Sequence, residues 1–340
     1  SGQHVQNFEG SERIMKKKLG ILMAAVIFAL TAFAGCGNSS SASSGNNGIK
    51  ILLSLNEMDD FRQTLVDGAT AAAAEQGIQL DVKDAEGSIE NQSAFIKSAE
   101  SDGYDAIICS PVSIDTVVAL KANAGNLPIV FINSCPDEKY LEADKYIYVG
   151  SDEKVAGQYQ AEYVLDALSD KSELNVVILK GPKVHSATIG RTKGVKETLE
   201  ASGKTINYVF DDYADWDQDT AADLFKVFLN TGVTPDCVIC NNDSMALGII
   251  DACKEENIDL AKLPVLGIDA TTNGCEAIED GDMAFTVYQS GKGQGTAAVE
   301  AAAHLAKGES TGSMDGVTDD GKYVWVPFEK VDKSNVSDYK

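Results

Sequence analysis

The sequence predicts an α/β protein built from two doubly wound parallel-sheet lobes. From residue 49 onward, short apolar runs alternate with longer amphipathic segments, a pattern typical of β–α units in a parallel sheet that is covered on both faces. This alternation occurs twice along the chain. The length of 340 residues also suits two domains better than one.

The first series of β–α units forms the predicted first lobe. Its apolar runs are short and rich in Ile, Leu and Val, so we expect strands at 49–55, 78–82, 106–109 and 129–132. The amphipathic segments between them predict helices at 61–76, 91–101 and 114–124.

The second series repeats the pattern and forms the predicted second lobe. We expect strands at 176–179, 206–210, 237–240, 265–268 and 284–287, and one more short strand at 324–326. The segments between them predict helices at 186–201, 220–229, 244–256 and 274–280. Gly291, Gly293 and Gly295 do not complete a dinucleotide-binding fingerprint, so we interpret them as a flexible helix start beside a hinge.

Residues 15–36 carry the signals of an exported protein. The lysines at 16–18 precede an apolar run over 19–33, which is the pattern of a secretory signal peptide and is short for a bilayer-spanning helix. The letters FAGC at 33–36 resemble a bacterial lipobox, so we expect 15–36 to be a lipoprotein signal peptide and Cys36 to be lipidated. The protein should then sit at the outer face of the bacterial cytoplasmic membrane, or in the periplasm.

The segments on either side of this signal add no fold information. Residues 37–48 are rich in Ser, Gly and Asn and predict a flexible tether. Residues 1–14 precede the apparent start at Met15, and we interpret them as a scar or a mis-called start.

The formal net charge of -24 limits the partners of the chain. A strongly acidic surface repels nucleic acids and anionic lipid headgroups. We therefore expect no nucleic-acid partner, and contact with the membrane through the lipid anchor only.

No combination of residues indicates an enzyme. With only His4, His185 and His304, the chain cannot assemble a histidine-based metal site, and it has no Ser-nucleophile or nucleotide-binding motif. Cys237 and Cys240 are three residues apart in a predicted strand, so they should face opposite sides of a sheet as small apolar residues. We expect no catalytic residue, no cofactor and no metal.

Polar and aromatic residues follow nearly every predicted strand. Ligands of parallel sheets bind at the carboxyl ends of the strands. Amides and carboxylates bond hydroxyl groups, and aromatic rings cover C–H surfaces, so these residues suit a neutral polyol. One Asn or Asp alone is more often a turn or cap residue, and we interpret Asp243 as a helix cap. The candidate binding residues are Asp59, Asp60, Phe61, Asn133, His185, Arg191, Trp216, Asn242, Asp269 and Gln289.

Several segments together resemble the type 1 periplasmic sugar-binding proteins, in particular those for galactose and glucose. The resemblance covers about 49–335 and depends on the order and spacing of the matches. The most telling segments are MDDF at 58–61, LPIVFINSCP at 127–136, ADWD at 214–217, NNDSMALG at 241–248 and TVYQ at 286–289.

The resemblance implies that three chain crossings join the lobes, near 149–152, 287–291 and 325–328. The first lobe would then comprise 49–149 plus 291–324, and the second 152–286 plus 328–340. Phe61 and Trp216 match the aromatic pair that sandwiches the sugar ring. The other candidates match residues that hold hydroxyl groups, with Asp59 as the alternative to Asp60 and with Gln289 where the family has Asn.

The resemblance also implies the function. The protein would bind a hexose of the galactose/glucose type, or its glycoside, as a monomer and deliver it to an ABC transporter permease with its ATPase. The alternative is a sugar-sensing co-receptor for a chemoreceptor or sensor kinase. Ala187 replaces a sugar-binding Asp, which favours a glycoside, and the short segment 169–173 lacks the family's calcium loop.

Overall fold

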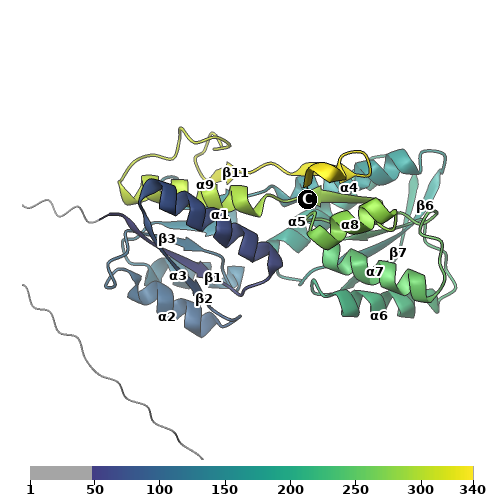
Figure 1. The fold of residues 1–340 in the computed structure, drawn as a ribbon, viewed down its shortest axis with the longest axis horizontal. Coiled ribbons are helices and arrows are strands. Elements are labelled where there is room, and N and C mark those ends of the chain that lie inside the picture. The colour runs from purple at the N-terminus through teal and green to yellow at the C-terminus, as the bar shows by residue number, and fades with distance from the viewer. Residues whose placement is uncertain (1–47, 340) are drawn as a thin grey trace, which may run out of the picture. The chain divides into compact units, whose positions relative to one another are not determined.

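In the computed structural model, which describes residues 48–339, the chain forms two six-stranded sheets flanked by helices (Figure 1). The first lobe lies on the left of Figure 1 and the second on the right. The predicted fold class is confirmed. The predicted signal peptide, Cys36, the tether up to residue 47 and His4 lie outside the described residues.

The first lobe contains a parallel sheet with the order β11-β5-β4-β3-β1-β2. Its strands are β1 (Lys50–Leu55), β2 (Gln79–Asp84), β3 (Ala106–Cys109), β4 (Ile129–Ile132), β5 (Tyr146–Gly150) and β11 (Tyr323–Trp325). Its helices are α1 (Asp60–Gln76), α2 (Ile89–Ala99), α3 (Val117–Asn123) and α9 (Gly291–Ala306), with 3₁₀ turns η1 (Ile114–Thr116) and η2 (Glu138–Tyr140).

The second lobe repeats this topology with the order β12-β10-β9-β8-β6-β7, in which only β12 runs antiparallel. Its strands are β6 (Glu173–Lys180), β7 (Thr205–Tyr213), β8 (Cys237–Cys240), β9 (Val265–Leu266), β10 (Phe285–Tyr288) and β12 (Glu329–Asp332). Its helices are α4 (Glu153–Ala167), α5 (Ser186–Glu200), α6 (Gln218–Leu229), α7 (Asp243–Glu255) and α8 (Thr272–Asp280), followed by the 3₁₀ turn η3 (Val336–Tyr339).

The chain crosses between the lobes after β5, after β10 and after β11. The predicted crossing segments 149–152, 287–291 and 325–328 contain these three points. Because α9 follows the second crossing and packs on α1, a helix from late in the chain completes the first lobe (Figure 1).

Glycines bring pairs of helices unusually close in both lobes. A Cβ atom on Gly295 of α9 would overlap the carbonyl oxygen of Leu65 in α1, and one on Gly291 would overlap the Thr64 hydroxyl. In the second lobe, a Cβ atom on Gly157 of α4 would overlap the carbonyl oxygen of Arg191 in α5. The glycines at the start of α9 are therefore required for close packing against α1. This packing, and not the flexibility that we predicted, explains why glycine occupies these positions.

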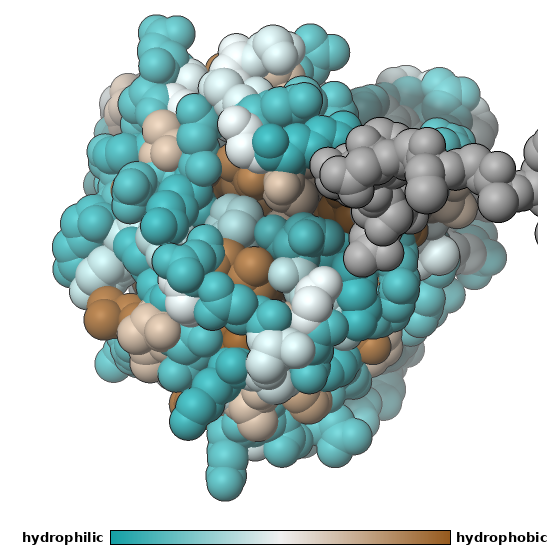
Figure 2. All heavy atoms as spheres, turned by 90° about the vertical axis from the view of Figure 1, so that its left-hand side faces the viewer, coloured by the Kyte–Doolittle hydropathy of each residue, from teal (hydrophilic) through white to brown (hydrophobic). Residues whose placement is uncertain are grey.

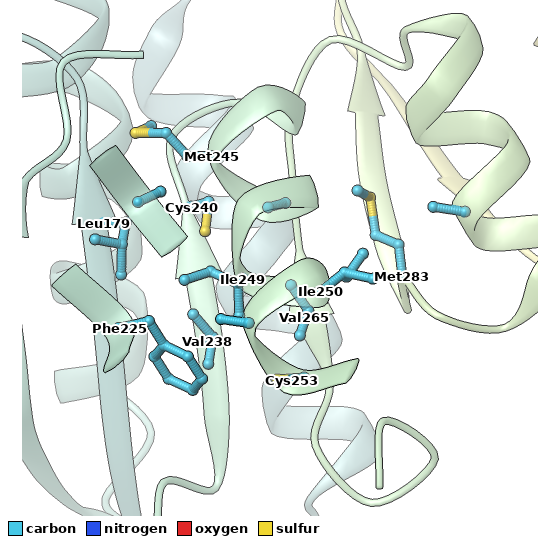
Figure 3. Close-up of a cluster of buried hydrophobic side chains, with 14 of the residues drawn as sticks. Leu179, Phe225, Val238, Cys240, Met245, Ile249, Ile250, Cys253, Val265 and Met283 are labelled. Atoms are coloured by element: carbon cyan, nitrogen blue, oxygen red, sulfur yellow. The ribbon is translucent and has the colours of Figure 1, made fainter. Parts of the chain in front are cut away.

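The core of the second lobe lies on both sides of its sheet. Figure 3 shows Leu179, Phe225, Val238 and Ile249 meeting between the sheet and the helices α6 and α7, with Cys240 among them. Cys237 packs into the separate cluster on the other face of the sheet. The prediction that the two cysteines face opposite sides is confirmed, and no disulfide links the six cysteines of residues 48–339.

Three elements were not predicted: β5, α4 and β12. Helix α4 was missed because its buried face is made of small or polar side chains, among them Ala156, Gly157 and Gln160, so it lacks an apolar stripe. Strand β12 is four residues long and largely exposed, which leaves little apolar pattern to detect.

The surface of the first lobe is mostly hydrophilic in the face that Figure 2 presents, with hydrophobic residues in small separate spots. Among residues 48–339, no helix is both long and apolar enough to cross a membrane.

Candidate ligand-binding site

Nine of the ten predicted binding residues line one pocket between the lobes, which we call the ring pocket. Arg62 and Ala187 complete its lining, and its volume is about 60 Å³. The nine are Asp59, Phe61, Asn133, His185, Arg191, Trp216, Asn242, Asp269 and Gln289. They come from seven segments of the chain, and the sheet topology gathers them because each follows the carboxyl end of a strand or crossing.

The tenth residue, Asp60, lies elsewhere. Asp60 is exposed in the first turn of α1 and lines a larger neighbouring groove. Asp59 precedes it as the N-cap of α1 and accepts a hydrogen bond from the Arg62 backbone nitrogen at 2.7 Å. Asp59, which we predicted as the alternative to Asp60, therefore lines the ring pocket, and Asp60 does not.

Arg62 is a pocket residue that the sequence analysis missed. Its side chain is 6% exposed, and its Nη1 atom lies 2.6 Å from the Asp59 carboxylate. Its Nε atom donates to Asn133 Oδ1 at 3.3 Å. The sequence did contain a signal for Arg62, since it follows Asp59 by three residues at the start of a helix. Side chains at that spacing lie on the same helix face and can form an ion pair.

Arg191 of α5 is held from four sides. Its Nε donates to Glu153 Oε2 at 2.6 Å, Nη1 to the carbonyl oxygen of Asn241 at 2.6 Å, and Nη2 to Gln289 Oε1 at 3.0 Å. The Asp269 carboxylate lies 3.7 Å from Nη1. The guanidinium is therefore fixed before a ligand arrives, which reduces the entropy that binding must remove. Burial raises the pKa of Glu153, and the charge of Arg191 opposes this.

His185 and Trp216 form an aromatic corner of the pocket. The His185 Nδ1 atom accepts a hydrogen bond from the Ala187 backbone nitrogen at 3.1 Å as the N-cap of α5, so the ring proton is on Nε2. Burial, followed by the charge of Arg191, lowers the pKa of His185 to about 3. The imidazole is edge-on to the Trp216 ring with centroids 5.5 Å apart. The indole lies against Gly181, where a Cβ atom would overlap the ring.

Asp243 has a different role from the helix cap we predicted. The N-cap of α7 is Asn242, whose Oδ1 accepts from the Met245 backbone nitrogen at 3.0 Å. Asp243 is fully buried and accepts hydrogen bonds from the backbone and hydroxyl of Thr271, at 2.8 and 3.1 Å, and from the Thr286 hydroxyl at 2.6 Å. Burial raises the pKa of Asp243 to about 6, and these hydrogen bonds oppose the rise.

Asp269 depends on this buried network. The backbone nitrogen of Ala270 donates to the Thr286 hydroxyl at 3.3 Å, directly beside Asp269. Asp269 and Ala270 have φ angles of 124° and 49°, which side chains other than glycine rarely adopt. Burial raises the pKa of Asp269 well above its usual range, with Arg191 opposing. Asn133 and Trp216 also have positive φ, at 61° and 69°, so backbone strain is concentrated at the pocket.

The described residues contain no group of three or more His, Cys, Asp or Glu side chains that could hold a metal ion. The segment 169–173 forms a short turn into β6. The lining of the ring pocket consists of hydrogen-bonding side chains, two aromatic side chains and Ala187.

Comparison with known proteins identifies the family. A model of the periplasmic binding protein domain matches residues 50–310. A putative rhizopine-binding protein of Rhizobium meliloti is 30% identical over 288 residues, covering 84% of this chain and 86% of the relative. A D-galactose/methyl-galactoside binding periplasmic protein of Haemophilus influenzae is 31% identical over 278 residues, covering 77% and 82%.

Comparison with solved structures supports the same family. The crystal structure of an ABC transporter solute binding protein from Bacillus halodurans with bound myo-inositol has a TM-score of 0.75 and 31% identity, covering 87% of this chain and 99% of that one. These relatives are solute-binding transport proteins and not enzymes. The chain thus belongs to the periplasmic binding protein family, as a type 1 binding protein related to the sugar-binding components of ABC transporters.

Proposed function

We propose that this protein binds a six-membered-ring polyol in the ring pocket and delivers it to an ABC transporter permease. The observation that carries the proposal is the convergence of nine predicted binding residues from both lobes on one pocket. A galactose- or glucose-type hexose, or its glycoside, is the first candidate ligand.

The chemistry of the pocket supports a neutral polyol. Phe61 from the first lobe and Trp216 from the second offer aromatic faces for C–H surfaces. The Asp59 and Asp269 carboxylates accept hydrogen bonds from hydroxyl groups, and the His185 Nε2 proton can be donated to one. Both arginines of the pocket are already paired with carboxylates, so the site has no unbalanced positive charge for an anionic ligand.

The size of the pocket supports hinged binding. Its volume of about 60 Å³ is well below the roughly 300–1,000 Å³ typical of small-molecule sites. A ring can enter only if the lobes separate at the three crossings. The ligand contacts both lobes when they close around it, so binding shifts the population toward the closed form that a permease would recognise.

Ala187 supports the glycoside variant of the proposal. Its methyl group is buried and lines the pocket where the family has a sugar-binding Asp. Losing a charge-assisted hydrogen bond there costs about 1.5–3 kcal/mol for a free sugar hydroxyl and leaves space for a substituent. A relative with 31% identity is named for both galactose and methyl-galactoside.

A cyclitol is the second candidate ligand, and Arg62 favours it. Arg62 with Asp59 faces the ring pocket from the first lobe, and Arg191 with Asp269 faces it from the second. Two such pairs suit a ring with hydroxyl groups on all sides. A structural neighbour with 31% identity holds myo-inositol.

We also propose that the protein is exported and anchored through lipidated Cys36. Metabolic labelling with a tagged fatty acid tests this. Wild type should incorporate label into the membrane fraction, and Cys36→Ser should not. Equal labelling of both would refute the anchor without affecting the binding proposal.

A thermal-shift screen tests the ligand class. Pentoses, hexoses, cyclitols and methyl glycosides would each be added to the purified protein. A ligand at 100 times its Kd stabilises by about 2.7 kcal/mol, which is a clear rise in Tm.

A pair of aromatic variants then locates the site. Trp216→Ala should abolish the shift, and Tyr208→Ala, in the same lobe but outside the pocket and the crossings, should retain it relative to its own unliganded Tm. If no polyol raises the Tm of wild type, the proposal is wrong.

A further inference from the structure

A second, larger cavity, which we call the outer groove, borders the ring pocket between the lobes. Its volume is about 860 Å³. Phe61, Asp269 and Gln289 line both cavities, so the two are directly adjacent. The outer groove continues between the start of α1 in the first lobe and α8 with η3 in the second.

Carboxylates and tyrosines make up six of the fifteen residues that line the outer groove. Besides Asp269, its carboxylates are Asp60, Glu329 and Asp338, and its one lysine is Lys292. The carboxylate groups therefore outnumber the cation, and the local potential is negative.

Two tyrosines give the outer groove an ordered wall. The rings of Tyr288 and Tyr339 lie 5.1 Å apart, and the Tyr339 hydroxyl donates to Glu329 Oε2 at 2.7 Å. This contact attaches η3 to the crossing strands β10 and β12, so the groove wall is fixed by bonds within the second lobe. Tyrosine faces of this kind cover apolar or cationic groups.

A buried amide stands at the junction of the two cavities. Gln289 is 4% exposed, and its Oε1 accepts from Arg191. The hydrogen bond from Arg191 orients the amide, and the Nε2 atom is not among the buried polar atoms without a partner in residues 48–339. Because Gln289 lines both cavities, its Nε2 atom is placed to donate a hydrogen bond to a ligand oxygen there.

We propose that the outer groove is a subsite for a neutral or cationic substituent carried by the bound ring, and that it rejects anionic substituents. The ring lies in the ring pocket, the Gln289 amide donates to the oxygen that joins ring and substituent, and the substituent extends between the tyrosines and the carboxylates. The inference rests on the proposed polyol binding and narrows its substrate class to O-substituted rings such as glycosides, with sugar phosphates excluded.

Calorimetric titration of the whole protein tests this subsite. The probes are a hexose that binds, its methyl glycoside, its 2-aminoethyl glycoside and its 1-phosphate, each in both anomeric forms. In one anomeric series, the methyl and aminoethyl glycosides should bind within about threefold of the free hexose or tighter. The 1-phosphate should bind at least 100-fold more weakly.

Charge variants link these affinities to the groove. Asp60→Asn combined with Asp338→Asn should reduce aminoethyl glycoside binding severalfold and improve 1-phosphate binding, with the methyl glycoside unchanged. Asp67→Asn, farther along α1 and outside the groove lining, is the matched control and should change none of them.

The outcomes separate the two proposals. If the hexose binds and every substituted form is more than 100-fold weaker, or if the 1-phosphate binds as well as the methyl glycoside, the subsite is refuted while polyol binding stands. If the hexose and every other polyol fail to bind, the proposed function itself fails.

Discussion

Thr286→Val tests whether the buried Asp243 network holds Asp269 in its binding position. The substitution keeps the shape of the side chain but removes the hydroxyl. That hydroxyl donates to Asp243 at 2.6 Å and accepts from the Ala270 backbone nitrogen at 3.3 Å. A hydrogen bond to a buried carboxylate contributes about 1.5–3 kcal/mol, so the free energy of unfolding should fall by about that amount.

The same change should weaken ligand binding. Ala270 and Asp269 occupy a strained turn with positive φ, and the turn keeps this shape because Thr286 and Thr271 tie it to Asp243. Without one tie, we expect the Asp269 carboxyl group to lose about one hydrogen bond to the ligand, or roughly 1 kcal/mol. That loss corresponds to a Kd about fivefold higher.

Calorimetry on a double-mutant cycle separates positioning from general destabilisation. Thr286→Ser, which keeps a hydroxyl, should bind like wild type. In an Asp269→Asn background, Thr286→Val should have little further effect on Kd, because the group it positions has already been altered. If Thr286→Val binds the ligand with wild-type affinity, or if its effect is equally large in both backgrounds, the positioning argument is wrong.

Three further outcomes follow from the structure. Gly295→Ala should lower the unfolding free energy by about 1–3 kcal/mol in urea titrations because its Cβ overlaps the α1 backbone. Gly293→Ala, whose Cβ would meet side-chain atoms of Ser290 and Val326 and no backbone atom, should cost less, and equal losses would contradict the packing argument. Because the pKa of folded His185 is about 3 and that of an unfolded histidine about 6.5, the unfolded chain takes up this proton first as the pH falls, and stability is lost below about pH 6.5. Between pH 7 and pH 5, the unfolding free energy of wild type should fall by about 2 kcal/mol more than that of His185→Asn, a variant that keeps a capping side chain. If the unfolding free energies of the two proteins change equally with pH, His185 is not held uncharged in the folded protein. Arg62→Lys should raise the Kd about tenfold in calorimetry because a lysine cannot reproduce the bonds to both Asp59 and Asn133, and an unchanged Kd would remove Arg62 from the site.

The strand pattern predicted most of the fold because the central strands are buried on both faces. Runs such as 106–109 and 237–240 are wholly apolar and short, which leaves little choice of structure. Helix α4 was not predicted because most of the residues it buries are small or polar, and glycine and glutamine carry no periodic apolar signal. Its residue Glu153, which holds Arg191, could not be found without that helix.

The residues that line the ring pocket could be predicted where they follow strands, and less well where the local backbone geometry determines which residue faces the pocket. The choice between Asp59 and Asp60 depends on which residue caps α1, since adjacent residues at a helix start point in different directions. Likewise, the pattern of an acid before an amphipathic helix suggested Asp243 as the cap, but Asn242 fills that position and Asp243 turns into the core. In both cases, tertiary contacts determine which of two adjacent residues caps the helix.

The interleaving of the two lobes has a consequence for how the chain matures. Helix α9, which covers α1 and faces β3 and β4, is separated from α1 by more than 200 residues of sequence, so one of the two core clusters of the first lobe cannot be buried until nearly the whole chain is available. Contacts between such distant segments slow folding. A chain emerging residue by residue would stay loosely structured until α9 follows, and that is the condition in which a polypeptide can be threaded through a narrow translocation channel before it folds on the far side.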